Sequence, residues 1–185
     1  MVLTKTPVCD FGKKAEDFKL KSINNKIISL NDIKGEKATL IMFICNHCHY
    51  VKAIIKDLAK DCNEMKKDGI NSVAIMSNDT KNYPEDSFEN MIKFADNNNF
   101  GEINYLFDET QEIAKKYGAV CTPDFFGYNK KLELQYRGRF RELKDLKPVN
   151  NGDSDLKIAM KMVAQTQKGP NEQIPSMGCN IKWFN

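Results

Sequence analysis

The hydrophobic pattern of the first half of the chain alternates between strand-like runs and stretches with helical spacing. Residues 39–44 form an apolar run that is typical of a strand buried on both faces. Beyond it, apolar residues recur every three or four positions and predict one long helix that stops at Asp68-Gly69. The residues of that stripe are Val51, Ile54, Ile55, Leu58, Cys62 and Met65. Residues 71–76 then predict a second strand.

The rest of the chain continues this alternation. A second helix is expected after Pro84, a short strand at 105–107 and a short helix ending at Gly118. Residues 125–126 and 132–136 predict a hairpin around Asn129, and a last amphipathic helix spans residues 156–164. Near the start, residues 18–20 and 27–30 flank the turn-like pair Asn24-Asn25 and predict another hairpin.

This order of elements places the chain in the α/β class. Alternating strands and helices imply parallel strands with crossover helices, and the later hairpin adds an antiparallel edge. We therefore expect one mixed central sheet with helices on both faces and a β-hairpin near the N-terminus. A length of 185 residues suits a single domain over 1–185, with a polar lead-in at 1–16 and a C-terminal tail at 170–185.

Composition and charge exclude several classes of function. The chain is 41% hydrophobic, and its net charge of +3 is too small to indicate nucleic acid or a membrane as a partner. The longest apolar run is only strand-sized. The first residues show neither the apolar stretch nor the cleavage site of an export signal, so we expect a cytoplasmic protein.

Two of the six cysteines, Cys45 and Cys48, are separated by only two residues and lie where the buried strand meets the long helix. Unpaired N–H groups and the helix dipole stabilise a thiolate at such a position. We therefore expect Cys45 to attack a disulfide and Cys48, one turn further, to resolve the mixed intermediate. His47 would add positive charge beside the thiolate.

Other chemistries also fit these residues. The string Cys45-Asn-His-Cys48-His49 matches the pattern of covalent haem attachment, which a cytoplasmic location disfavours. A metal site could use Cys45, Cys48, a histidine and the distant Cys121. The chain has no second pair with this spacing, so we expect no resident metal and no cofactor.

A second marker is Thr122-Pro123, which falls a strand and a helix later, at the start of a strand. Cys121 directly precedes it and is expected near the dithiol, as a third redox thiol, a metal ligand or a packed residue. Cys62 lies on an apolar helix face and is expected in the core. For Cys9 and Cys179, in the terminal segments, inert exposure is the favoured expectation and a mixed or intermolecular disulfide the alternative.

The chain resembles the peroxiredoxin-like branch of the thioredoxin superfamily, within the alkyl hydroperoxide reductase and thiol-specific antioxidant family. The matching segments are residues 45–48, 50–53, 83–87, 117–126, 136–139 and 176–183. The resemblance implies a thioredoxin-like fold and thiol-based redox work, with Pro123 as a cis-proline that faces the dithiol and, with Thr122, shapes a docking groove.

The chain departs from that family at several positions. His49 stands where relatives usually have proline, and Met42 stands where peroxide-reducing relatives keep a hydroxyl residue before the reactive cysteine. Arg137, Arg139 and Arg141 alternate with aromatic residues, which could bind single-stranded nucleic acid, but a solvated strand face is the favoured interpretation.

These observations favour a thiol–disulfide oxidoreductase that uses Cys45 and Cys48. A thiol peroxidase acting on hydroperoxides is the alternative within the enzymes, and a Cys/His metal-binding module is the alternative of another class. The expected partners are protein or small-molecule disulfides or peroxides and a cellular thiol reductant.

Overall fold

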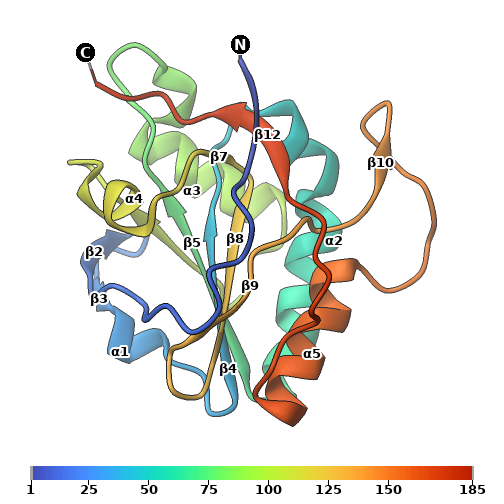
Figure 1. Cartoon of the computed structure of the whole chain (residues 1–185). Coiled ribbons are helices and arrows are strands. Elements are labelled where there is room, and N and C mark those ends of the chain that lie inside the picture. The colour runs from blue at the N-terminus through green and yellow to red at the C-terminus, as the bar shows by residue number, and fades with distance from the viewer. Residues whose placement is uncertain (1, 185) are drawn as a thin grey trace.

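The computed structural model describes residues 2–184, and its core is a seven-stranded mixed sheet with the order β3-β2-β6-β5-β4-β8-β9 (Figure 1). Strands β4, β5 and β6 run parallel to one another, and the remaining neighbours pair antiparallel. The strands are β2 (Lys19–Ser22), β3 (Ile27–Ser29), β4 (Ala38–Phe43), β5 (Ile70–Met76), β6 (Asn104–Phe107), β8 (Asp124–Asn129) and β9 (Leu134–Tyr136). The predicted mixed sheet and N-terminal hairpin are confirmed.

Helices cover both faces of this sheet, because its central strand is apolar on both sides. In β4, Leu40 and Met42 pack in one core with the long helices, and Ile41 and Phe43 pack in a second core on the opposite face. The first core contains α2 (His49–Lys66), α3 (Phe88–Asn97) and α5 (Asp155–Thr166). The second contains α1 (Leu30–Ile33) and α4 (Glu112–Tyr117). In the described part, no helix is both long and apolar enough to cross a membrane.

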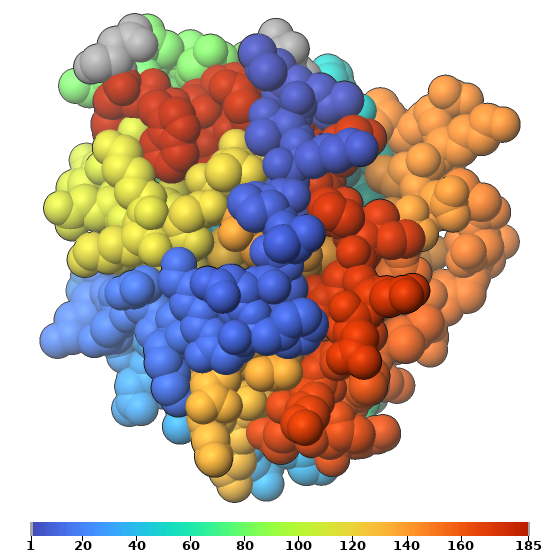
Figure 2. Space-filling model, viewed as in Figure 1, coloured from blue at the N-terminus to red at the C-terminus, as the bar shows by residue number. Residues whose placement is uncertain are grey.

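The two ends of the chain form a second sheet that the hydrophobic pattern did not indicate. Strand β12 (Met177–Asn180) lies between β1 (Leu3–Lys5) and β7 (Cys121–Thr122), antiparallel to both. The N-terminal and C-terminal segments lie side by side on one face of the molecule (Figure 2). This sheet fixes the C-terminal tail against the residues that precede Pro123.

The loop after β9 carries the short hairpin of β10 (Leu143–Lys144) and β11 (Lys147–Pro148), which projects from the body (Figure 2). The arginines just before it are not a uniformly solvated face. Arg137 is 8% exposed and forms an ion pair with the fully buried Asp124, at 2.9 Å. Its guanidinium also lies over the ring of Phe126. The prediction of a solvated strand face is therefore wrong for Arg137.

Candidate active site

The dithiol loop connects the end of β4 to the start of α2. Cys48 is the residue immediately before the helix, at its N-cap, and Cys45 lies three residues earlier in the loop. The sequence placed Cys45 at the helix start, so the helix begins later than expected. Both thiols are buried, at 1% exposure for Cys45 and 0% for Cys48.

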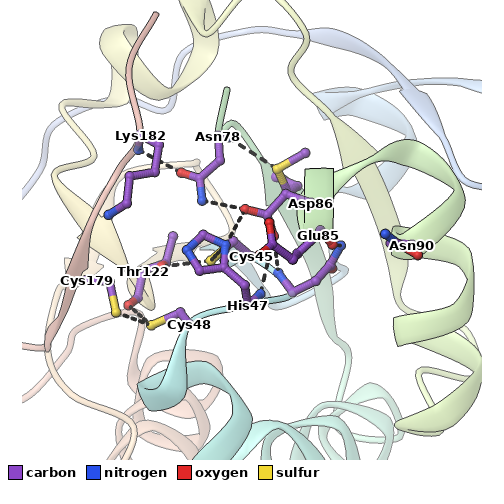
Figure 3. A network of polar contacts seen from close by, with 12 residues as sticks. Cys45, His47, Cys48, Asn78, Glu85, Asp86, Asn90, Thr122, Cys179 and Lys182 are labelled. Atoms are coloured by element: carbon purple, nitrogen blue, oxygen red, sulfur yellow. Dashed lines mark hydrogen bonds and ion pairs between the residues drawn. The ribbon is translucent and has the colours of Figure 1, made fainter. Parts of the chain in front are cut away.

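A buried carboxylate, Asp86, holds this loop in place (Figure 3). Asp86 belongs to the short 3₁₀ helix η1 (Pro84–Asp86), which follows β5. Its Oδ1 accepts the backbone N–H groups of Asn46, at 2.8 Å, and His47, at 3.3 Å. Its Oδ2 accepts from Asn78 Nδ2 at 2.8 Å. The conformation between the two cysteines therefore depends on an acid about forty residues away in the chain.

His47 connects the same carboxylate to the first thiol. Its Nδ1 lies 2.7 Å from Asp86 Oδ2 and 3.9 Å from Cys45 Sγ. The hydrogen bond to Asp86 raises the pKa of His47 above its ordinary value, and partial burial opposes that change. The imidazole ring also stacks on the ring of Tyr83, with centroids 5.6 Å apart. Asp86 therefore stabilises a positive charge on His47, whose ring lies beside Cys45.

Thr122 contacts both sulfurs of the pair, from strand β7. Its Oγ1 lies 3.3 Å from Cys45 Sγ, and its carbonyl oxygen lies 3.1 Å from Cys48 Sγ. The peptide bond between Thr122 and Pro123 is cis. The expected position of a cis Thr-Pro pair opposite the dithiol agrees with the structure.

The pKa values of the two thiols are shifted in opposite directions. Hydrogen bonds from the Cys45 and Cys179 thiols and from the Val51 backbone N–H, in the first turn of α2, favour the Cys48 thiolate, whereas the Thr122 carbonyl oxygen at 3.1 Å accepts from Cys48 only when its thiol is protonated. Together the hydrogen bonds to the thiolate lower the pKa of Cys48 to about 4, against the opposing effect of burial. Burial is the main reason why the pKa of Cys45 lies well above its ordinary value, and the hydrogen bond with Cys48 raises it further. The sequence had predicted Cys45 as the reactive thiolate.

The profile of the AhpC/TSA family matches residues 11–140, which include the dithiol loop, Asp86 and the Thr122-Pro123 pair. The chain belongs to the AhpC/TSA family. Thiol-dependent oxidoreductases and peroxidases make up this family, so the protein is an enzyme of that class, with disulfides or peroxides as substrates and a thiol as reductant. No curated protein sequence matches the chain.

Solved structures similar to this AhpC/TSA family protein include two whose functions are not described. A conserved protein from Geobacillus kaustophilus is 38% identical, with a TM-score of 0.94 over 100% of this chain and 97% of its own. A hypothetical protein from Sinorhizobium meliloti 1021 is 36% identical, with a TM-score of 0.90 and 98% of each chain covered. The thioredoxin domain of a thiol-disulfide oxidoreductase from Bacteroides vulgatus is 18% identical, at a TM-score of 0.58 over 69% of this chain and 86% of its own, and shows the shared fold.

The third cysteine at the site of this AhpC/TSA family protein is Cys179, which sequence reasoning favoured as an inert, exposed thiol. It is 1% exposed, and its Sγ lies 2.9 Å from Cys48 Sγ (Figure 3). Burial raises its pKa to about 12. The expectation of exposure is wrong, because β12 carries Cys179 to a position opposite Thr122. The one available signal was that residues 176–183 resemble the family although they lie in a terminal tail.

Cys121 occupies a different environment, although it is adjacent to Thr122. Its Sγ makes a hydrogen bond to the Pro123 carbonyl at 3.6 Å, and burial raises its pKa. Among the described residues, no hydrogen bond joins it to Cys45 or Cys48, which favours the packed-residue interpretation. Cys62 is buried in the core, as predicted, with its sulfur 3.9 Å from Met42 Sδ.

The alternative set of metal ligands, Cys45, Cys48, a histidine and Cys121, is not assembled in the described residues. The group that the structure does bring together is Cys45, His47 and Asp86, whose ligand atoms lie within 4.8 Å of one another. Both carboxylate oxygens of Asp86 already accept N–H groups, and the Cys48 sulfur faces thiols and a carbonyl oxygen. This donor set serves the loop and the thiolate better than it would serve an ion.

Proposed function

We propose that this protein exchanges electrons with disulfides through Cys45 and Cys48. The observation that carries the proposal is the pair of buried thiols at the N-terminal end of α2, which both contact Thr122, the residue before the cis Thr122-Pro123 bond. A helix N-terminus and neighbouring donors stabilise a thiolate, which is the nucleophile in disulfide exchange. We also propose that the protein works in the cytoplasm.

The exchange has two steps at one centre. The Cys48 thiolate attacks a sulfur of the substrate disulfide, forms a mixed disulfide and releases one substrate thiolate. Cys45, which gives up its proton, then attacks the Cys48 sulfur, forms the Cys45–Cys48 disulfide and releases the second thiolate. Two electrons have passed to the substrate, and a thiol reductant returns them. The position of Cys48 at the N-cap of α2 and its lowered pKa support this order over initial attack by Cys45.

A groove of about 480 Å³ beside Pro123 supports docking of an extended substrate. Tyr50 and Ile54 line it from the start of α2, and Phe140 and Met177 line it from the C-terminal half. Lys5, Arg139, Arg141 and Asp145 line it as well, so the groove offers both apolar and charged contacts to a chain that carries a disulfide.

The test is the rate at which the reduced protein reduces oxidised glutathione, followed with Cys48→Ser and with the control Cys62→Ser. We expect Cys48→Ser to lose roughly 100-fold or more, because no other thiol is held as a thiolate, and Cys62→Ser to stay near wild type. Peptide mapping of the oxidised wild-type protein should recover a Cys45–Cys48 disulfide. Full activity in Cys48→Ser would overturn the proposal.

Peroxide reduction is the second candidate, and one contact favours it. The Thr122 hydroxyl lies 3.3 Å from Cys45 Sγ, so a peroxide attacked by Cys45 would meet a hydroxyl although Met42 supplies none. In that reaction a thiolate attacks one peroxide oxygen, which gives a sulfenic acid and the other oxygen as hydroxide, and a second thiol then condenses with loss of water. The measurement is the rate of oxidation by hydrogen peroxide in wild type and Thr122→Val. A rate no faster than that of a free thiolate, unchanged in Thr122→Val, would exclude peroxidase activity.

A further inference from the structure

We propose that Cys179 is a second resolving thiol and that Cys48 forms a disulfide with it as well as with Cys45. The inference rests on the proposed function, since it assigns a further redox residue to the same site. Cys48 has two thiol neighbours, because it shares a hydrogen bond with Cys45 and lies 2.9 Å from Cys179 Sγ. Each of the flanking thiols is therefore positioned to attack the same sulfur.

The sheet of chain ends fixes Cys179 in this position. In the pairing of β12 with β7, Cys179 lies opposite Thr122, the residue that contacts both sulfurs of the dithiol. Ser176 Oγ donates to the Pro123 carbonyl at 2.8 Å. A Cβ atom at Gly178 would lie 2.0 Å from the Thr122 carbonyl oxygen, so the backbones approach as closely as glycine allows. The fold therefore holds Cys179 next to Cys48.

The distance to be closed is short. The two sulfurs must move from 2.9 Å to the disulfide length of about 2.0 Å, which small side-chain rotations can supply. Both residues are buried, and the pairing of β12 with β7 holds Cys179 beside Cys48.

Two balanced routes lead to the same bond. In the first, Cys179 attacks the Cys48 sulfur of a mixed disulfide, forms Cys48–Cys179 and releases the substrate thiol, which takes up the proton. In the second, Cys179 attacks the Cys48 sulfur of the Cys45–Cys48 disulfide, and Cys45 leaves and receives the Cys179 proton. The second route moves a disulfide without any net oxidation, so it needs no further oxidant. Its product keeps the disulfide, now between Cys48 and Cys179, while Cys45 returns to its thiol form.

The test uses the single variant Cys45→Ser and two double variants that add Cys179→Ser or Cys121→Ser. Each reduced protein is treated with oxidised glutathione, quenched in acid, alkylated and mapped by mass spectrometry. We expect Cys45→Ser to form an internal Cys48–Cys179 disulfide and to lose the mass of two hydrogens. The bond should persist when Cys121 is also replaced and disappear when Cys179 is replaced, leaving glutathione attached to Cys48. Near-ultraviolet circular dichroism of the reduced variants checks that each one is folded.

The outcomes separate this inference from the proposed function. If wild type forms Cys45–Cys48 but folded Cys45→Ser accumulates only the glutathione adduct on Cys48, the exchange function stands and the role of Cys179 is refuted. If wild type reduces no disulfide and forms no internal bond at Cys48, the proposed function itself fails. Two rates are compared: formation of the Cys48–Cys179 bond in Cys45→Ser, and addition of glutathione to Cys48 in the double variant Cys45→Ser, Cys179→Ser. If the first is at least as fast as the second, Cys179 is a second resolving thiol.

Discussion

Replacing Asp86 with asparagine tests how the dithiol loop is held. The carboxylate accepts four N–H groups, from the backbones of Asn46 and His47 and from the side chains of His47 and Asn78. An asparagine side chain has one acceptor oxygen, and its NH₂ group would face donors. At least one pair of buried donors therefore loses its acceptor, whichever way the amide is turned.

The expected cost follows from that count. Each buried donor without a partner costs about 1–3 kcal/mol, so we expect Asp86→Asn to lower the free energy of unfolding of the reduced protein by roughly 3 kcal/mol. For a domain of this size that corresponds to a melting temperature lower by about 6–12 °C. The measurement is urea and thermal unfolding of reduced wild type and Asp86→Asn, with the exposed Asp96→Asn as the matched control.

The cost should also depend on pH, through His47. Asp86 raises the pKa of His47 in the folded state, so the stability that this pair contributes is fully present below the unfolded value of about 6.5. It is lost as pH rises through the higher, folded value. The difference between wild type and Asp86→Asn should therefore be larger near pH 5.5 than near pH 8.5. A variant within about 0.5 kcal/mol of Asp96→Asn at both values would refute the role assigned to Asp86.

Three further predictions concern the thiolate, a buried ion pair and the second sheet. The ultraviolet absorbance of the thiolate in the reduced protein should titrate with a midpoint near the Cys48 pKa of about 4 and be absent in Cys48→Ser at neutral pH; a midpoint near that of a free cysteine would contradict this. Arg137→Ala should lower the free energy of unfolding by about 3–5 kcal/mol, because it leaves Asp124 buried without its cation; urea unfolding within about 1 kcal/mol of wild type would contradict this. Gly178→Ala should slow formation of the Cys48–Cys179 disulfide in oxidation assays, because the added Cβ meets the Thr122 carbonyl and pushes β12 away from β7; an unchanged rate would contradict this.

The parts of the fold that the sequence predicted depend on local patterns. The apolar run that became β4 and the stripe that became α2 each carry their own periodicity, so the strand–helix junction at the dithiol could be located within a few residues. The helix start was placed too early, because the spacing of apolar residues does not show where the first turn begins. The structure begins α2 at His49, and that shift moves the helix N-terminus from Cys45 to Cys48.

The parts that sequence reasoning missed depend on contacts between distant segments. Asp86 lies in a polar stretch with no periodicity, and only the fold brings its carboxylate to the dithiol loop. Arg137 belongs to an alternating pattern of basic and aromatic residues, which is typical of an exposed strand. The pairing of β8 with β9 instead brings it to Asp124, and no property of its own segment could show that partner.

The placement of Cys179 suggests how the chain departs from a two-cysteine site. The AhpC/TSA family match ends at residue 140, before β12, whereas the similar proteins of Geobacillus and Sinorhizobium span nearly the whole chain. The third thiol is therefore supplied by a segment outside the family match. Its strand pairs with the residue before Pro123, so the element that faces the dithiol also positions Cys179. A substrate that docks beside Pro123 would then meet a site in which the proposed second resolving thiol lies 2.9 Å from Cys48 Sγ.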